Sequence, residues 1–200
     1  YAAGTMMAEL AECFVVGRDP ARISDIWNDF YYHTFWGKGA GAIFYAAVSG
    51  LEQALWDIKG KVLGVPVCEL LGGRQRDELR VYANGWSEGR CDTPRDFAKR
   101  AEEVVADGFD AVKMYPLSQR DPVRNLNRHL KNREISPENY RRCIDSVRMV
   151  REAIGNDIDL MVDVTAEGTT DVMTRIGQEI EQYNPFWYEE PLDAFDVDAY

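Results

Sequence analysis

The stretch "SPENYRRCIDSVRMVREAIGNDIDLMVDVT", residues 136–165, has the sequence signals of a complete helix followed directly by those of a strand. Ser136 has the short polar side chain that caps helix N-termini, Pro137 suits the first helical position, and Gly155 suits the end of the helix. The segment 158–165 is apolar and contains several β-branched residues, over a length typical of a buried strand. These residues therefore predict one helix–strand unit of a parallel α/β sheet.

The same alternation of strand and helix continues on both sides of this unit. Further strands are predicted at 79–85, 109–116 and 186–190, and further helices at 93–108 and 169–184. Parallel neighbours need a long connection, so this order indicates a parallel sheet with helical crossovers. It fits either a doubly wound sheet or half of a (β/α)₈ barrel.

The beginning of the chain is helical throughout. Helices are predicted at 6–16, at 19–32 with Asp19 as N-cap and Pro20 next, at 43–61, and in a short segment starting at Pro66. The change near residue 79 predicts two parts, 1–78 and 79–200. We expect the chain to be cut at both ends, because it opens on Tyr1 and stops soon after a strand.

Composition and charge exclude several classes of partner. The chain is 46% hydrophobic and 28% charged, which is ordinary for a globular protein, and its formal net charge is −11. Such a charge argues against nucleic acid and against an anionic membrane surface as partners. The four cysteines are scattered without a zinc-site spacing, and the apolar segment 6–16 is interrupted by two glutamates. We therefore expect a cytoplasmic protein.

Charged side chains stand at the predicted carboxyl ends of three strands, where parallel α/β folds place their chemistry. Lys113 precedes Tyr115, Asp163 precedes Thr165, and Glu189 ends the last strand. Because side chains alternate between the two faces of a strand, Lys113 and Tyr115 are expected to share one face. Asp163 and Thr165 are likewise expected to share a face.

The same alternation separates the two adjacent acids in "FWYEEP", residues 186–191. Glu189 is expected to align with Trp187, and Glu190 is expected to point to the opposite face. Carboxylates that end neighbouring strands repel each other unless they share a proton or a cation, and oxygen ligands suit Mg²⁺. A nearby lysine would be poised as a base by that cation. The alternative is a set of surface ion pairs.

Three motifs together resemble the mandelate racemase-like branch of the enolase superfamily. They are "SGLEQALWDIKGKVLGVPVCELLGG" at 49–73, an aspartate ending the third strand, and "EEP" ending the fourth, with Asp163 and Glu189 26 residues apart. The resemblance implies an α+β capping domain and a modified (β/α)₈ barrel. Residues 1–78 would be the helical part of the cap, and residues 79–200 the first four β/α units of the barrel.

The resemblance also implies roles for the residues at the strand ends. Asp163 and Glu189 match the first two Mg²⁺ ligands, with Mn²⁺ as the alternative ion, and Glu190 would support the metal site or a helix terminus. Lys113 matches a catalytic lysine. Tyr115 stands where many members have a second lysine, and is expected to donate a proton or orient the substrate.

Two further residues are expected to bind substrate. Thr165 stands where members resembling galactonate dehydratase have a histidine. Trp36 begins the loop "WGKGAG" at 36–41, which matches a mobile loop of the capping domain, with a plain inter-helix loop as the alternative. Residues 117–136 form a basic insertion after the second strand, interpreted as a solvated flap or subunit contact, with an arginine contact to the substrate as the alternative.

The function that the resemblance implies is that of a carbon–oxygen lyase. It would remove the proton beside the carboxylate of a sugar acid and eliminate water to give a 2-keto-3-deoxy acid. A racemase, epimerase or cycloisomerase acting through the same enediolate is one alternative, and a catalytically silent barrel used for binding or assembly is another. A homo-oligomer is expected.

Overall fold

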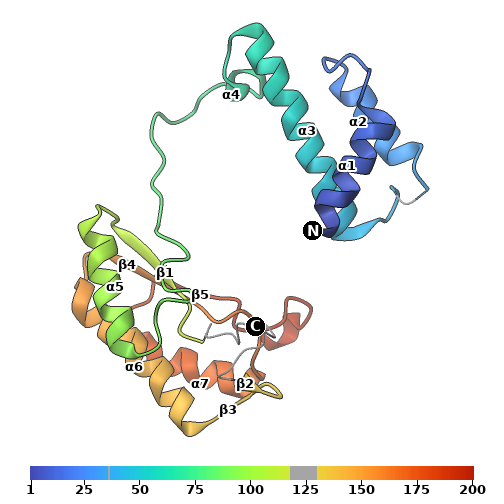
Figure 1. Cartoon of the computed structure of the whole chain (residues 1–200). Coiled ribbons are helices and arrows are strands. Elements are labelled where there is room, and N and C mark those ends of the chain that lie inside the picture. Colours follow the sequence, from blue (N-terminus) through green and yellow to red (C-terminus); the bar gives the residue numbers. More distant parts are fainter. Residues whose placement is uncertain (36, 118–129) are drawn as a thin grey trace. The chain divides into compact units, whose positions relative to one another are not determined.

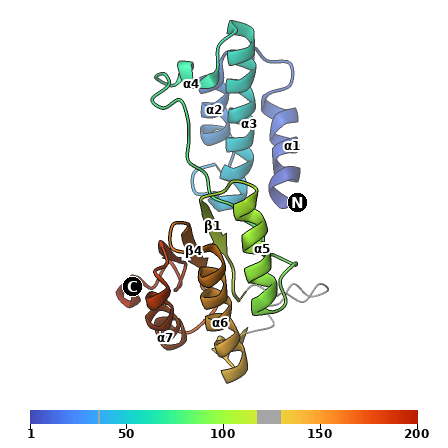
Figure 2. The ribbon, with the colours of Figure 1, turned by 90° about the vertical axis from the view of Figure 1, so that its left-hand side faces the viewer.

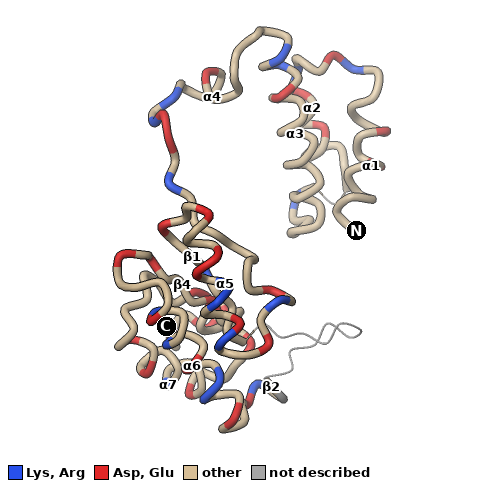
Figure 3. The backbone as a smooth tube through the Cα atoms, turned by 60° about the vertical axis from the view of Figure 1, so that its left-hand side comes forward, with Lys and Arg blue, Asp and Glu red and all other residues tan. Residues whose placement is uncertain are grey.

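The computed structural model describes residues 1–35, 37–117 and 130–200, which divide into two compact units, Tyr1–Leu79 and Arg80–Tyr200 (Figure 1). The side chain of Lys131 is not among the described parts. Acidic and basic positions are interspersed along the backbone of both units (Figure 3). Every helix in the described ranges is too short or too polar to cross a bilayer.

The first unit is built from helices. They are α1 (Ala2–Phe14), α2 (Ile23–Tyr32), α3 (Gly41–Leu63) and the short α4 (Val67–Leu70). Helices α1 and α2 both pack against α3, and the apolar side chains between them form one core that includes Ile26, Phe30 and Leu55. The helices predicted at 6–16 and 43–61 are confirmed, although α1 begins four residues earlier and ends two residues earlier than predicted, and α3 is longer at both ends. Gly64 ends α3 in the left-handed conformation, at φ 70°.

The start of α2 differs from the prediction. Asp19 does not cap the helix; its carboxylate accepts the Ala21 N–H at 2.9 Å, and its carbonyl accepts the Arg22 N–H at 3.2 Å. These two bonds form a turn, so the helix begins only at Ile23. A short polar side chain serves a turn as readily as a helix cap, and sequence alone did not separate the two uses.

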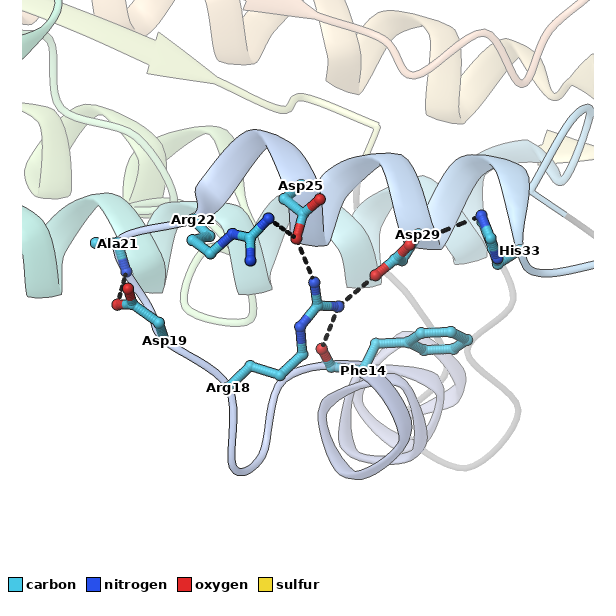
Figure 4. A network of polar contacts seen from close by, with 8 residues as sticks. All are labelled: Phe14, Arg18, Asp19, Ala21, Arg22, Asp25, Asp29 and His33. Atoms are coloured by element: carbon cyan, nitrogen blue, oxygen red, sulfur yellow. Dashed lines mark hydrogen bonds and ion pairs between the residues drawn. The ribbon is translucent and has the colours of Figure 1, made fainter.

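An arginine joins the end of α1 to the side of α2 (Figure 4). Arg18 donates to the Phe14 carbonyl at 3.3 Å and to Asp25 at 2.7 Å, and it also bonds Asp29. Arg22 reaches Asp25 from the other side at 3.2 Å. The network therefore holds the connection between the two helices at several points.

The second unit contains a three-stranded parallel sheet in the order β1–β4–β5. The strands are β1 (Ala111–Met114), β4 (Asp159–Asp163) and β5 (Trp187–Glu189), and the helices are α5 (Pro94–Ala106), α6 (Pro137–Ile154) and α7 (Thr170–Ile180). Shorter elements are a hairpin of β2 (Leu130–Lys131) and β3 (Glu134–Ile135), and the 3₁₀ turns η1 (Glu181–Tyr183) and η2 (Val197–Ala199). The predicted alternation is confirmed.

Helix caps fix where each crossover helix begins. Thr93 and Asp96 form a reciprocal capping box at the start of α5. The Ser136 hydroxyl accepts the Asn139 N–H at 3.2 Å at the start of α6, and the Thr169 hydroxyl accepts the Val172 N–H at 3.4 Å at the start of α7. The cap predicted at Ser136 is confirmed.

One face of the sheet packs on the helices and the other carries the polar residues. Val112, Met114, Leu160 and Val162 belong to the buried core, together with side chains from α5, α6 and α7. Figure 2 shows α5 and α6 side by side along the strands, with α7 following. Alternation then places Lys113, Asp163 and Glu189 on the opposite face.

The predicted strands are longer than the observed ones. The segment 79–85 forms a single bridge, Ala83 to Val112, and Leu79 and Val81 on it are exposed. β4 ends at Asp163, and Thr165 lies beyond it at φ 55°, so strand alternation does not set the direction of Thr165. The β-branched and aromatic residues of these segments predicted extended backbone. Hydrogen bonding with a neighbouring strand, however, decides where a strand ends.

Candidate metal centre

The Lys113 ammonium lies between two carboxylates that end neighbouring strands. Its Nζ is 3.2 Å from Asp163 Oδ2 and 2.7 Å from Glu189 Oε1. Asp163 and Glu189 are direct partners in the parallel register of β4 and β5, so the sheet spacing itself brings the two acids together. Lys113 and Asp163 are only 5% and 4% exposed, and Glu189 is partly buried.

The remaining oxygen of each carboxylate accepts a hydrogen bond from the protein. The Thr165 backbone N–H donates to Asp163 Oδ1 at 3.0 Å, and the Trp187 indole N–H donates to Glu189 Oε2 at 2.9 Å. All four carboxylate oxygens are thus held by N–H donors. Both carboxylates are therefore held in a fixed orientation by the protein itself.

Burial and charge act in opposite senses on these groups. Burial is the largest influence on Lys113 and acts to lower its pKa, but interactions with Glu189, Tyr115 and Asp163 together hold that pKa above the ordinary value. Burial raises the pKa of Asp163, and the hydrogen bond from Lys113 partly opposes this. Lys113 in this arrangement is an ammonium ion that donates to both acids.

Tyr115 lies just beyond β1 and faces the ammonium with its ring. Lys113 Nζ is 5.1 Å from the Tyr115 ring centroid, and the Tyr115 hydroxyl donates to Asn84 Oδ1 at 3.0 Å. Burial raises the pKa of Tyr115. The phenol therefore keeps its proton near neutral pH and acts as a donor.

The segment before α5 supplies contacts that sequence reasoning missed. Asn84 accepts from the Tyr115 hydroxyl, and the Ser87 hydroxyl accepts from the Tyr115 N–H at 3.4 Å. Lys113 Nζ also lies 5.9 Å from the Tyr82 ring centroid. In the sequence, these contacts could have been suspected only from a run of polar and aromatic residues around Ala83, which pairs with β1. Which of these residues lie near Tyr115 is visible only in the folded structure.

Thr165 and Glu190 take part through their backbones. Both adopt positive φ, at 55° and 46°, and the Ala166 N–H donates to the Glu190 carbonyl at 2.7 Å. Thr165 lies beside Asp163, whose carboxylate its N–H holds. Glu190 lies past the end of β5 and its side chain is exposed, so strand alternation does not set its direction.

Two predicted regions lie partly or wholly outside the described residues. Trp36 is outside them, and so are residues 118–129 of the basic insertion. The end of that insertion is described: the Arg133 guanidinium donates to the Gly168 carbonyl at 2.7 Å, and the Arg133 carbonyl accepts the Thr169 N–H at 3.1 Å. These bonds join the hairpin to the loop after β4.

The two acids fit a hard divalent cation. Asp163 and Glu189 offer oxygen donors of combined charge −2 that already converge on one positive group, the Lys113 ammonium. Within the described ranges, no three His, Cys, Asp or Glu side chains are grouped closely enough to hold a metal. The residues present thus suit an ion such as Mg²⁺, which takes one or two carboxylates and completes its shell with water and substrate.

Comparison with known families gives matches in both units. Residues 2–72 match the N-terminal domain of mandelate racemase/muconate lactonizing enzyme, and residues 96–200 match the enolase C-terminal domain-like family. The chain belongs to the enolase superfamily. Its helical unit corresponds to the N-terminal cap of the mandelate racemase-like enzymes, and its α/β unit to part of their barrel, so the resemblance and fold class predicted from the sequence are confirmed.

Individual relatives extend beyond this chain. D-gluconate dehydratase of Thermoproteus tenax is 37% identical over 185 residues, which are 92% of this chain and 35% of that protein. D-galactonate dehydratase of Xanthomonas euvesicatoria is 36% identical over 191 residues, which are 94% of this chain and 44% of the relative. The chain thus spans less than half the length of these curated relatives.

Solved structures of this superfamily share the fold. One from Mesorhizobium loti is 45% identical with a TM-score of 0.87, and the match covers 99% of this chain and 50% of that one. An enolase superfamily member from Salmonella Typhimurium is 33% identical with a TM-score of 0.83, covering 99% of this chain and 52% of the other.

Proposed function

We propose that the full-length protein is a Mg²⁺-dependent hydro-lyase acting on a sugar acid. It removes the proton beside the substrate carboxylate and eliminates water, giving a 2-keto-3-deoxy acid. The observation that carries the proposal is the Lys113 ammonium held by Asp163 and Glu189 at the strand ends of an enolase-superfamily domain. The names of the relatives, D-gluconate and D-galactonate dehydratase, support this substrate class.

Asp163 and Glu189 are the proposed metal ligands. When bound, Mg²⁺ supplies positive charge beside the substrate carboxylate and stabilises the negative charge that builds up as the neighbouring proton leaves. The hydrogen bonds from Thr165 and Trp187 hold the two acids in place, so little reorganisation is needed during the reaction.

Lys113 and Tyr115 are the proposed catalytic residues. The interactions that raise the Lys113 pKa come from the carboxylates and Tyr115, whereas burial acts to lower it. Any positive charge that offsets the carboxylates therefore shifts Lys113 toward its neutral, basic form. Tyr115 keeps its proton and is proposed to donate it or to orient a substrate oxygen, while Thr165 and Trp36 remain predicted substrate contacts.

The test is a substrate panel with the full-length protein. Incubation with aldonic and aldaric acids in the presence of Mg²⁺ should give a 2-keto product from at least one of them. Lys113→Met and Asp163→Asn should each lower kcat by roughly 10²–10⁴-fold, and Arg148→Met on the surface of α6 should leave it unchanged.

The other outcomes select other functions. Exchange of the substrate α-hydrogen with deuterated solvent, without loss of water, would identify a racemase, epimerase or cycloisomerase instead. If the protein neither exchanges that hydrogen nor forms a product with any acid in the panel, and binds no Mn²⁺, the dehydratase proposal is wrong and a binding or assembly role replaces it.

A further inference from the structure

We propose that Trp187 determines which divalent cation this site prefers, by occupying Glu189 Oε2 and leaving only Oε1 for the cation. The inference rests on the proposed metal site and adds a positioning residue to it. Trp187 and Glu189 are two residues apart on β5, so they lie on the same face of the sheet, and the indole N–H reaches Glu189 Oε2 at 2.9 Å.

The two acids are held in the same way. Asp163 gives Oδ1 to the Thr165 N–H and directs Oδ2 at Lys113, while Glu189 gives Oε2 to Trp187 and directs Oε1 at the same ammonium. Each carboxylate thus has one oxygen bonded to a neutral N–H and one bonded to the shared Lys113 ammonium. The pair presents two oxygens to a cation, one from each acid.

The indole itself is held from two sides. Its ring packs edge-on against Tyr82, with centroids 5.6 Å apart and planes at 87°, and lies 5.5 Å from the Phe186 ring. Trp187 is also the parallel partner of Met161, which is buried. Because more than one neighbour holds the indole, loss of a single ring contact should leave its N–H directed at Glu189, and the hydrogen bond to a charged acceptor is of the stronger kind.

This arrangement distinguishes two common cations by how they bind carboxylates. Ca²⁺ takes six to eight oxygen ligands and often binds both oxygens of one carboxylate, whereas Mg²⁺ takes fewer ligands and keeps water. Occupying Glu189 Oε2 with an N–H therefore acts against Ca²⁺ more than against Mg²⁺. Removal of that N–H should weaken the preference for Mg²⁺.

The experiment measures cation binding by the full-length protein, without any need for activity. Binding of Mn²⁺ is followed by the electron paramagnetic resonance signal of the free ion, and Mg²⁺ and Ca²⁺ are then used as competitors. Trp187→Phe keeps the aromatic packing but removes the N–H. The ratio of Mg²⁺ affinity to Ca²⁺ affinity should fall by about tenfold, since a hydrogen bond to a charged group has about that effect.

Two further variants separate the hydrogen bond from the packing. Replacing Trp187 by 3-benzothienylalanine keeps the shape of the indole with sulfur in place of N–H, and should reproduce the change seen in Trp187→Phe if the latter folds poorly. Tyr82→Leu removes the edge-on ring contact but keeps the N–H, and its affinity ratio should stay within about twofold of the wild-type ratio.

The outcomes keep this inference apart from the proposed function. If the wild type binds Mn²⁺ and both replacements of Trp187 keep the wild-type ratio, or if Tyr82→Leu changes the ratio as much as they do, Trp187 has no such role and the metal site stands. If the wild type binds no Mn²⁺, the metal site is wrong and this inference is overturned with it.

Discussion

At the scale of single residues, one buried arginine holds the connections that precede two strands. Arg151 near the end of α6 donates to the carbonyls of Gly155, Ile158, Tyr183 and Asn184 at 2.7–3.1 Å. It is 8% exposed, and burial lowers its pKa. Carbonyls at chain turns find few other donors in the interior, so a planar group with several N–H donors suits this place.

Replacing Arg151 should lower the free energy of unfolding far more than replacing a surface arginine of the same helix. Arg151→Met should lower the free energy of unfolding by about 3 kcal/mol, because it leaves buried carbonyls without donors. Arg148→Met is the control; Arg148 pairs with Asp145 and Glu152 at the surface and should cost less than about 1 kcal/mol. Urea unfolding followed by circular dichroism measures both, and equal losses would contradict the argument.

At the scale of elements, the loop between β4 and α7 carries strain next to the site. Thr165 and Ala166 are consecutive residues with φ of 55° and 50°, a region that costs side chains other than glycine about 1–2 kcal/mol each. The Thr165 N–H and the Ala166 N–H are both used, by Asp163 and by the Glu190 carbonyl. The strained turn thus places two donors where the strand ends need them.

A glycine introduced into this loop should affect the free energy of unfolding in the opposite sense to a glycine introduced into a helix. Ala166→Gly should leave the stability unchanged or raise it by up to about 1 kcal/mol, because glycine adopts positive φ freely. Ala153→Gly within α6 should lower it by about 1 kcal/mol. The same unfolding measurement compares them, and a loss at Ala166 as large as that at Ala153 would show that the loop is not strained.

At the scale of the whole molecule, buried neutral thiols make the fold sensitive to alkali. Cys143 is fully buried in the core of the second unit, and burial raises the pKa of its thiol from 9.0 to about 12. The unfolded chain releases this proton at lower pH than the folded one. The resulting stability is complete below pH 9 and is lost as the pH rises toward 12.

The Cys143→Ala variant should lose less stability on going from pH 9 to pH 12 than the wild type. The difference in slope should approach about 1.4 kcal/mol per pH unit, the value for one proton. Cys13→Ala, at an exposed thiol of α1, should keep the wild-type slope. Unfolding free energies measured at several pH values give the three slopes, and parallel slopes for wild type and Cys143→Ala would refute the assignment.

The sequence was sufficient where local chemistry decides structure. Capping residues and prolines located the starts of α5 and α6 within a residue, because the Thr93 and Ser136 side chains accept N–H groups of the first turn of each helix. Alternation also separated Lys113 and Asp163 from the apolar face of their own strands and aligned Glu189 with Trp187, and the structure shows that the three charged side chains meet. The fold class followed from the same alternation together with the family motifs.

Contacts between distant segments were beyond sequence reasoning. The partner of the Tyr115 hydroxyl is Asn84, 31 residues earlier, and nothing local links the two. The segment 79–85 has strand-like residues, yet it pairs only through Ala83. The positive φ of Thr165 and Glu190 depends on the turns that follow the strands, and neither residue type signals it as glycine would.

The direct pairing of Asp163 with Glu189 in the sheet separates two kinds of spacing. Their proximity in space is set by the hydrogen-bonded ladder, whereas the number of residues between them is set by the length of α7 and its loops. Insertions that lengthen α7 by whole turns would therefore leave the positions of the two acids unchanged. A search for distant homologues should therefore align the strand ends and leave the interval between them open.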